Sequence, residues 1–158
     1  NKNILTTKNL DNLKFTIIFQ GFIKEIPLFI LFRALGIESD KEILSMILFN
    51  VPEYLVNKFI DILKPSIFDA YPITSQQMAL KYLMHIFNIK KIEELLFIIT
   101  NNCLPLYKTN YKKALYIGYM VRNLLEGIIG YKKPSDRDSM LYKRISSSGA
   151  ELATLFRE

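Results

Sequence analysis

Residues 111–129 read YKKALYIGYMVRNLLEGII, the longest regular helical pattern in the chain. Apolar side chains recur every three or four residues and fall on one stripe. That stripe consists of Ala114, Ile117, Val121, Leu124, Leu125 and Ile128. Off the stripe lie Lys112, Lys113, Arg122 and Glu126. The pattern predicts an amphipathic helix that ends near Gly130 and packs its stripe into a core.

Gly118 lies in the middle of this pattern. A glycine inside a helix costs about 1 kcal/mol relative to alanine. A helix that carries this cost usually needs close backbone approach at that point. We therefore expect another element to pack against Gly118 and Tyr119.

Further helical patterns precede this one. Leu55, Phe59, Ile62 and Leu63 recur at helical spacing from Pro52 onward, and Pro65 is expected to end that helix. Residues 89–99 predict another helix, broken at the sequence NNCLP that follows.

Two sequence pairs have the spacing of a helix-capping box. Ser39 with Glu42 predicts the start of a helix that runs through Phe49. Thr74 with Gln77, shortly after Pro72, predicts a second start. On one face of that second helix lie Met78, Tyr82 and Ile86.

The front of the chain carries a little β-structure. Residues 1–12 are polar and are expected to form an extended lead-in, whereas residues 14–20 are rich in β-branched and aromatic residues and predict a strand. Pro27 and Gly36 enclose a short, almost wholly apolar helix that should be buried. The fold class is therefore mainly α (α+β), with several helices and a short β element near the N-terminus.

Composition restricts the class of protein. The chain has 158 residues, a net charge of +6 and a pI near 9.3, and half of it is apolar, so it can form one domain with a real core. The charge permits an anionic partner such as nucleic acid without requiring one. A lone Cys103 excludes an internal disulfide, and no stretch suits a membrane span. Both ends are expected to be cuts through a longer polypeptide.

Residues 131–144, YKKPSDRDSMLYKR, form a connector with a high density of opposed charges. Asp136 and Asp138 could share a hard cation if further oxygen ligands were present. The simpler interpretation is a charged turn in which Arg137 pairs with carboxylates. Lys143 and Arg144 could bind phosphates, or equally could cover solvent or dock on an acidic protein surface.

No complete active site is evident. His85 is the single histidine, and neither a triad nor a zinc site can be assembled around it and Cys103 from the sequence. The glycines are scattered and form no phosphate-binding loop.

Three stretches together resemble the second-largest subunit of eukaryotic-type multisubunit RNA polymerases. Residues 25–44, EIPLFILFRALGIESDKEIL, are similar to its I-P-x-x-x-x-F-R-A-L-G-x-x-x-D-x-E-I-L segment. Residues 113–125, KALYIGYMVRNLL, are similar to its K-A-x-x-L-G-Y-M motif and the residues after it. Residues 136–157 match its D-R-D, K-R and L-F-R pattern, with departures around Ser146–Ser148. The order and separations fit, and the resemblance covers about residues 14–158.

The resemblance implies a location and a role. Residues 1–130 would be the C-terminal part of the lobe (domain 2), and residues 131–158 the connector and first helix of the returning protrusion. The region would wall the DNA cleft without catalytic or metal-binding residues of its own. Its connector residues would anchor the chain near nucleic acid: Asp136, Arg137, Asp138, Lys143 and Arg144.

The same resemblance implies the setting. Partners would be the largest subunit, small polymerase subunits, the DNA template and general transcription factors, and no membrane. Mg²⁺ and Zn²⁺ are expected elsewhere in the parent enzyme. Heavy use of isoleucine, asparagine, lysine, phenylalanine and tyrosine suggests an AT-rich genome. Together with the departures from the family pattern, it suggests a large cytoplasmic DNA virus, with a protist or a linear plasmid as the alternative sources. The enzyme would then be in a viral factory or virion, or in the nucleus if the source is cellular. The alternative is a basic helical protein-interaction module unrelated to polymerase.

Overall fold

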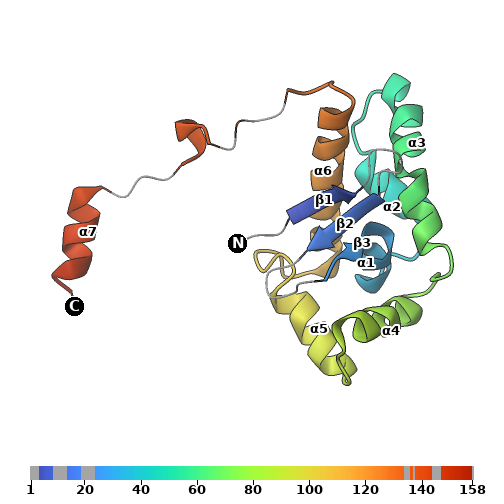
Figure 1. Ribbon diagram of the computed structural model, residues 1–158, viewed down its shortest axis with the longest axis horizontal. Helices are drawn as coiled ribbons and strands as arrows, with labels where there is room; N and C mark the ends of the chain where they lie inside the picture. Colours follow the sequence, from blue (N-terminus) through green and yellow to red (C-terminus); the bar gives the residue numbers. More distant parts are fainter. Residues whose placement is uncertain are drawn as a thin grey trace.

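Figure 1 shows the computed structural model of the chain, in which a small sheet lies against a group of helices. The structure describes residues 4–8, 14–18, 24–133, 136, 138–143 and 147–157, and for residues 4–8 and Tyr142 it describes the backbone alone. Helices dominate these residues, which confirms the mainly α class with β-structure at the N-terminal end.

The elements follow one another along the chain as strands first and helices afterwards. The strands are β1 (Ile4–Lys8), β2 (Lys14–Ile18) and β3 (Ile26–Pro27). The helices are α1 (Leu28–Ala34), α2 (Asp40–Ile47), α3 (Glu53–Ala70), α4 (Gln76–Phe87), α5 (Ile92–Asn101), α6 (Asn110–Ile128), the 3-10 turn η1 (Met140–Tyr142) and α7 (Ser148–Leu155).

The sheet is antiparallel, with β2 between β1 and β3. Strand β1 overturns the expectation that residues 1–12 form a lead-in, because residues 4–8 pair with β2, with Thr6 opposite Thr16. Isoleucine and threonine are β-branched and suit a strand even in a polar context. In β2, Phe15 and Ile17 are buried and the intervening Thr16 is half-buried, so one face of this strand meets the core.

Helix α1 is the centre of the core. All of its residues are buried, and it contacts α2, α3, α4, β2 and β3. Pro27 directly precedes it, and Gly36 follows it with φ +102°, a conformation that favours glycine. The predicted start and end of this buried helix are therefore confirmed.

Helix α3 passes through Pro65, where the sequence predicted its end, so that prediction is wrong. Proline inside a helix costs about 3 kcal/mol, because it lacks an amide hydrogen and crowds the preceding turn. Contacts beyond the proline offset this cost. The buried Ser66 Oγ accepts a hydrogen bond from the Phe15 amide at 2.9 Å, and the Ala70 carbonyl accepts one from Arg33 at 2.5 Å.

Helix α6 packs on α2, and the two backbones approach closely at Gly118. A Cβ atom built at Gly118 would lie 3.0 Å from the carbonyl oxygen of Met46 and 3.4 Å from the amide nitrogen of Ile47. The expectation that another element lies against this glycine is confirmed.

The buried face of α6 follows most of the predicted stripe, although Leu124 is only partly buried. Ala114, Ile117, Val121 and Leu125 are buried, whereas Ile128 at the helix end is 40% exposed. Lys113, expected off the stripe, is completely buried. A long side chain can place its methylenes in the core if its ammonium group finds acceptors there.

Both predicted capping boxes need correction. Ser39 precedes α2 as expected, but its side chain makes no capping hydrogen bond, and α2 ends at Ile47 rather than Phe49. Helix α4 is capped by Ser75 instead of Thr74, with the Ser75 Oγ accepting from the Met78 amide at 3.4 Å. Helix α5 spans Ile92–Asn101, shifted from the predicted 89–99.

The face of α4 that carries Met78, Tyr82 and Ile86 is mostly exposed to solvent. Met78 and Tyr82 are 45% and 37% exposed, and Ile86 is half-buried. The side chains that α4 contributes to the core are Ala79, Leu80 and Leu83.

Helix α7 has no buried residue, and Figure 1 shows it apart from α1–α6. None of the described helices combines the length and apolar character needed to cross a bilayer.

Candidate functional site

The charged connector forms a local turn where it is described. The Asp136 Oδ1 accepts a hydrogen bond from the Asp138 amide at 2.9 Å, and the Asp136 carbonyl accepts one from the Ser139 amide at 3.3 Å. Such an aspartate turn is a usual way to reverse a chain. It leads into η1, so Asp136 has a local structural role.

The structure brings two of the five predicted connector residues together as an ion pair. Lys143 Nζ lies 3.7 Å from Asp138 Oδ1, and both side chains are well exposed. An exposed pair of this kind contributes about 0–1 kcal/mol. Arg137 and Arg144 lie outside the described residues, so their roles stay predictions.

Catalytic or metal-binding groupings are not evident in the described part of the chain. Within it, no three histidine, cysteine or acidic side chains gather in a way that could hold a metal ion. His85 is exposed near the end of α4. Cys103 is buried, and burial raises the pKa of its thiol to about 11 against an opposing effect of Lys113. The thiol is therefore protonated near neutral pH and is a poor nucleophile.

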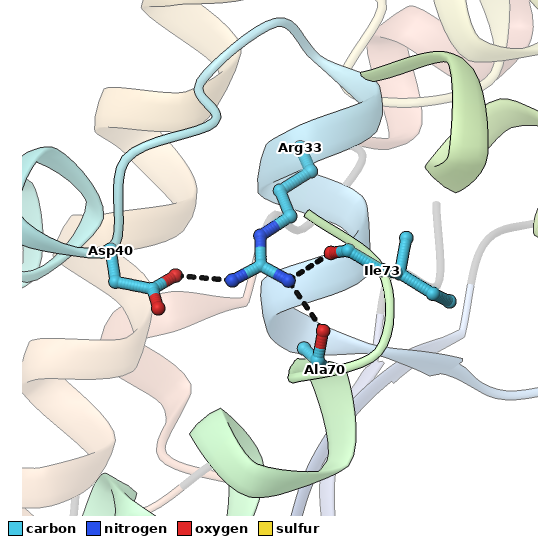
Figure 2. Close-up of polar contacts among 4 residues, drawn as sticks. All are labelled: Arg33, Asp40, Ala70 and Ile73. Carbon is cyan, nitrogen blue, oxygen red and sulfur yellow. Dashed lines mark hydrogen bonds and ion pairs between the residues drawn. The ribbon is translucent and has the colours of Figure 1, made fainter. Parts of the chain in front are cut away.

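A buried arginine joins four segments of the helical body (Figure 2). Arg33 of α1 is 3% exposed. Its Nη1 donates to the carbonyl oxygens of Ala70 and Ile73, and its Nη2 lies 2.5 Å from Asp40 Oδ1. The guanidinium group thus links α1 to the start of α2, the end of α3 and the loop before α4.

The contacts of Arg33 give a structural reason for the F-R-A-L-G-x-x-x-D motif, which in the sequence was evident only as a resemblance. Arg33 and Asp40 are the arginine and aspartate of F-R-A-L-G-x-x-x-D, and the turn between them contains Gly36. A planar guanidinium suits this task, because it donates in several fixed directions at once. Sequence reasoning missed the role, although an arginine inside an almost wholly apolar helix was a visible signal.

The same turn also caps α4. The Glu38 Oε1 accepts a hydrogen bond from the Gln76 amide at 2.7 Å, and the Gln76 Nε2 donates to the Ala34 carbonyl at 3.3 Å. A carboxylate at a helix N-terminus meets unpaired amides and the positive end of the helix dipole. The motif segment therefore fixes α4 as well as α2 and α3.

Lys113 anchors α6 to the end of α5. Its Nζ donates to the carbonyl oxygens of Ile99 at 3.0 Å and Thr100 at 2.5 Å. Burial lowers the pKa of Lys113, with Cys103 acting in the opposite direction. The last carbonyls of a helix lack partners within it and favour a cation, so Lys113 satisfies the C-terminus of α5.

These arrangements place three positions of the resembling motifs inside the helical body: Arg33, Lys113 and Gly118. The family RNA polymerase Rpb2, domain 2, matches residues 1–146 of the chain. The chain belongs to this family.

Curated relatives agree with the domain 2 assignment. DNA-directed RNA polymerase II subunit RPB2 of Encephalitozoon cuniculi is 36% identical over 85% of this chain and 12% of its own length. Subunit 2 of the same enzyme in Arabidopsis thaliana is 33% identical over 84% of this chain and 12% of its length. Subunit Rpo2N of Methanocaldococcus jannaschii is 30% identical over 88% of this chain and 29% of its length.

The chain thus spans about an eighth of the length of the eukaryotic relatives. The resemblance drawn from the motifs is confirmed, and an unrelated interaction module is not favoured. The domain 2 match contains α1–α6 and the connector, while α7 begins just beyond its last residue.

Proposed function

We propose that the chain is the domain 2 (lobe) portion of the second-largest subunit of a DNA-directed RNA polymerase, where it supports DNA-templated RNA synthesis without performing catalysis. The observation that carries this proposal is the match of residues 1–146 to domain 2 of that subunit. The described charged motif residues support a structural role, because Arg33, Asp40 and Lys113 hold helices together.

Within that role, we assign residues 1–130 to the lobe and residues 131–158 to the connector and first helix of the protrusion. The end of α6 at Ile128 and the positive φ of Gly130 support a boundary there. The full exposure of α7 is consistent with a helix that packs on other parts of the subunit.

The proposed partners are the largest subunit, small subunits, the DNA template and general transcription factors. Mg²⁺ and Zn²⁺ would be held elsewhere in the parent enzyme. A viral source is a narrower proposal. It rests on the departures from the family motifs together with the heavy use of isoleucine, asparagine, lysine, phenylalanine and tyrosine, and it would place the enzyme in cytoplasmic factories or virions. A cellular source would place it in the nucleus.

The test uses polymerase assembled with the whole second-largest subunit. The triple variant Arg137→Gln, Lys143→Gln and Arg144→Gln removes the connector cations, and Lys58→Gln on the exposed side of α3 is the single-charge control. If these cations face the cleft, the dependence of DNA affinity on salt should become shallower, by up to about 0.9 in log–log slope per lost phosphate contact.

Nucleotide addition by preformed elongation complexes should remain normal in the triple variant. Loss of nucleotide addition with intact assembly and DNA binding would contradict a non-catalytic role. Failure of the wild-type chain to assemble with polymerase subunits would contradict the assignment itself.

A further inference from the structure

The outer side of α6 carries large aromatic and aliphatic side chains among polar ones. Lys112, Tyr116, Tyr119 and Asn123 follow one another three or four residues apart and therefore share one face of the helix. Leu115 lies beside them, and Tyr107 from the preceding loop stacks on Tyr116 with ring centroids 5.2 Å apart. We call these six residues the tyrosine face.

The tyrosine face is open to solvent. Tyr119, Leu115 and Tyr116 are 49%, 40% and 37% exposed. A group of large apolar side chains exposed on one helix face is typical of a protein contact surface. Tyrosine is also enriched at protein–protein contacts, since one side chain offers a large apolar surface and a hydroxyl group.

Most of the charged residues around this face are cations. No aspartate or glutamate occurs between Glu94 and Glu126, whereas Lys108 and Lys112 are exposed at the start of α6. Beyond the other end of the face, Glu126 lies 3.2 Å from Arg122 Nε. At that end, Lys132 Nζ also bonds to Asn123 Oδ1 at 3.2 Å. The face is therefore apolar along its middle and has cations near both ends.

The aromatic rings are arranged for a protein and not for nucleic-acid bases. Tyr107 and Tyr116 cover each other, Tyr116 and Tyr119 have centroids 6.2 Å apart, and Arg122 lies over the Tyr119 ring at 5.5 Å. Base stacking needs free ring faces beside a row of cations that follows the phosphates. Here Arg122 is already engaged by Glu126 and by the Phe49 carbonyl at 2.7 Å.

We propose that the tyrosine face binds an acidic segment of a partner polypeptide, with apolar side chains over Leu115, Tyr116 and Tyr119 and carboxylates toward Lys108 and Lys112. This proposal rests on the polymerase assignment, and it adds the chemistry of one partner that would bind domain 2. Exposed Phe49, whose carbonyl is held by Arg122, extends the apolar surface toward the end of α2.

The test measures binding of the 158-residue chain to three probes: the random copolymer of glutamate and tyrosine, polyglutamate, and oligothymidylate. The copolymer should bind more tightly than either other probe. Tyr119→Ser and Tyr116→Ser should each weaken copolymer binding by about tenfold or more, as expected for buried interface tyrosines. Tyr71→Ser, which changes an exposed tyrosine at the end of α3, should leave binding unchanged.

The charge component is tested separately. Lys108→Gln with Lys112→Gln should weaken copolymer binding by roughly three- to tenfold and reduce its salt dependence. Lys58→Gln with Lys64→Gln on α3 is the matched control. Thermal unfolding of each variant verifies that the fold persists.

Three outcomes would overturn the proposal. Oligothymidylate binding that is tighter and is lost in the tyrosine variants would indicate a nucleic-acid surface. Equal binding of polyglutamate and the copolymer would indicate attraction by net charge alone. Copolymer binding unchanged by the tyrosine variants would remove the face as a binding site. These binding measurements use the 158-residue chain alone. A negative result would therefore not contradict the polymerase assignment, and a failure of polymerase assembly would not change the binding result.

Discussion

Gly118→Ala is the most direct test of how α2 and α6 pack. The added methyl carbon would lie 3.0 Å from the Met46 carbonyl oxygen, 3.1 Å from its carbon and 3.4 Å from the Ile47 nitrogen. These are backbone atoms, so no side-chain rotation can make room. The two helices would have to separate by a few tenths of an ångström.

The magnitude follows from two opposing effects. Alanine improves the helix by about 1 kcal/mol relative to glycine. Overpacking a well-packed contact costs about 1–3 kcal/mol. Gly118→Ala should therefore lower the free energy of unfolding by up to about 2 kcal/mol.

Gly127 offers a matched control in the same helix, because a Cβ atom there would meet nothing within 4 Å. Gly127→Ala should raise the free energy of unfolding by about 0.5–1 kcal/mol. The helix-propensity gain is nearly the same in both variants and cancels when their changes in the free energy of unfolding are subtracted. The remaining difference, about 1–3 kcal/mol, is the cost of crowding α2.

The assay is urea unfolding followed by circular dichroism, with the slope of the transition compared between variants. Hydrogen exchange should also become faster in α2 for Gly118→Ala and stay unchanged for Gly127→Ala. If both alanine variants stabilise the chain equally, the close approach of α6 to α2 is wrong.

Three further substitutions or modifications test the buried polar groups. Arg33→Met should lower the free energy of unfolding in urea by about 3–5 kcal/mol, because it leaves the Ala70 and Ile73 carbonyls without their donor and breaks the pair with Asp40. A loss below about 1 kcal/mol would contradict the role of Arg33 in linking these segments. Lys113→Met should lower the free energy of unfolding by about 1–3 kcal/mol, because it leaves carbonyls at the end of α5 unpaired. Lys112→Met on the exposed side should change it by less than about 0.5 kcal/mol. Equal effects of the two substitutions would contradict the role of Lys113 in holding α6 to α5. Alkylation of Cys103 by iodoacetamide at mildly alkaline pH should be slower in the folded chain than in urea by on the order of 100-fold, because the thiol pKa is raised to about 11; equal rates would show that the thiol is neither buried nor shifted.

Local chemistry made several elements predictable. Pro27 and Gly36 delimit α1 because their backbone preferences act within a turn, and Gly118 signalled a close contact because a mid-helix glycine has a cost of its own. The family, too, could be recognised from ordered motifs, without knowing what the motif residues contact.

Two of the failures have the same physical cause, which is contact between residues distant in sequence. Pro65 did not end α3, because Ser66 bonds to Phe15 and Ala70 to Arg33 across gaps of 51 and 37 residues. The sequence pattern places Lys113 off the buried stripe, because the carbonyls of α5 that accept its hydrogen bonds lie near it only after α5 and α6 pack.

The candidate functional residues were likewise only partly predictable from the sequence. The sequence pointed to the charged connector, and where that connector is described its charges engage one another locally. The tyrosine face was not predicted, because helical periodicity indicates which side of α6 is buried and does not show what lies against the other side. The available signal was a set of three tyrosines, in a stretch without carboxylates that runs from the loop before α6 to the middle of that helix: Tyr107, Tyr116 and Tyr119.

By itself, the sequence determined the mainly helical class, the position of the buried helix α1, the stripe of α6 and membership of the RNA polymerase Rpb2, domain 2 family. Periodicity and backbone preference are local properties, so the order of residues contains them. The tertiary structure decided where α3 ends, why Arg33 and Lys113 can be buried, and which face of α6 remains open. Those outcomes depend on desolvation and hydrogen-bond partners, which exist only once distant segments have come together.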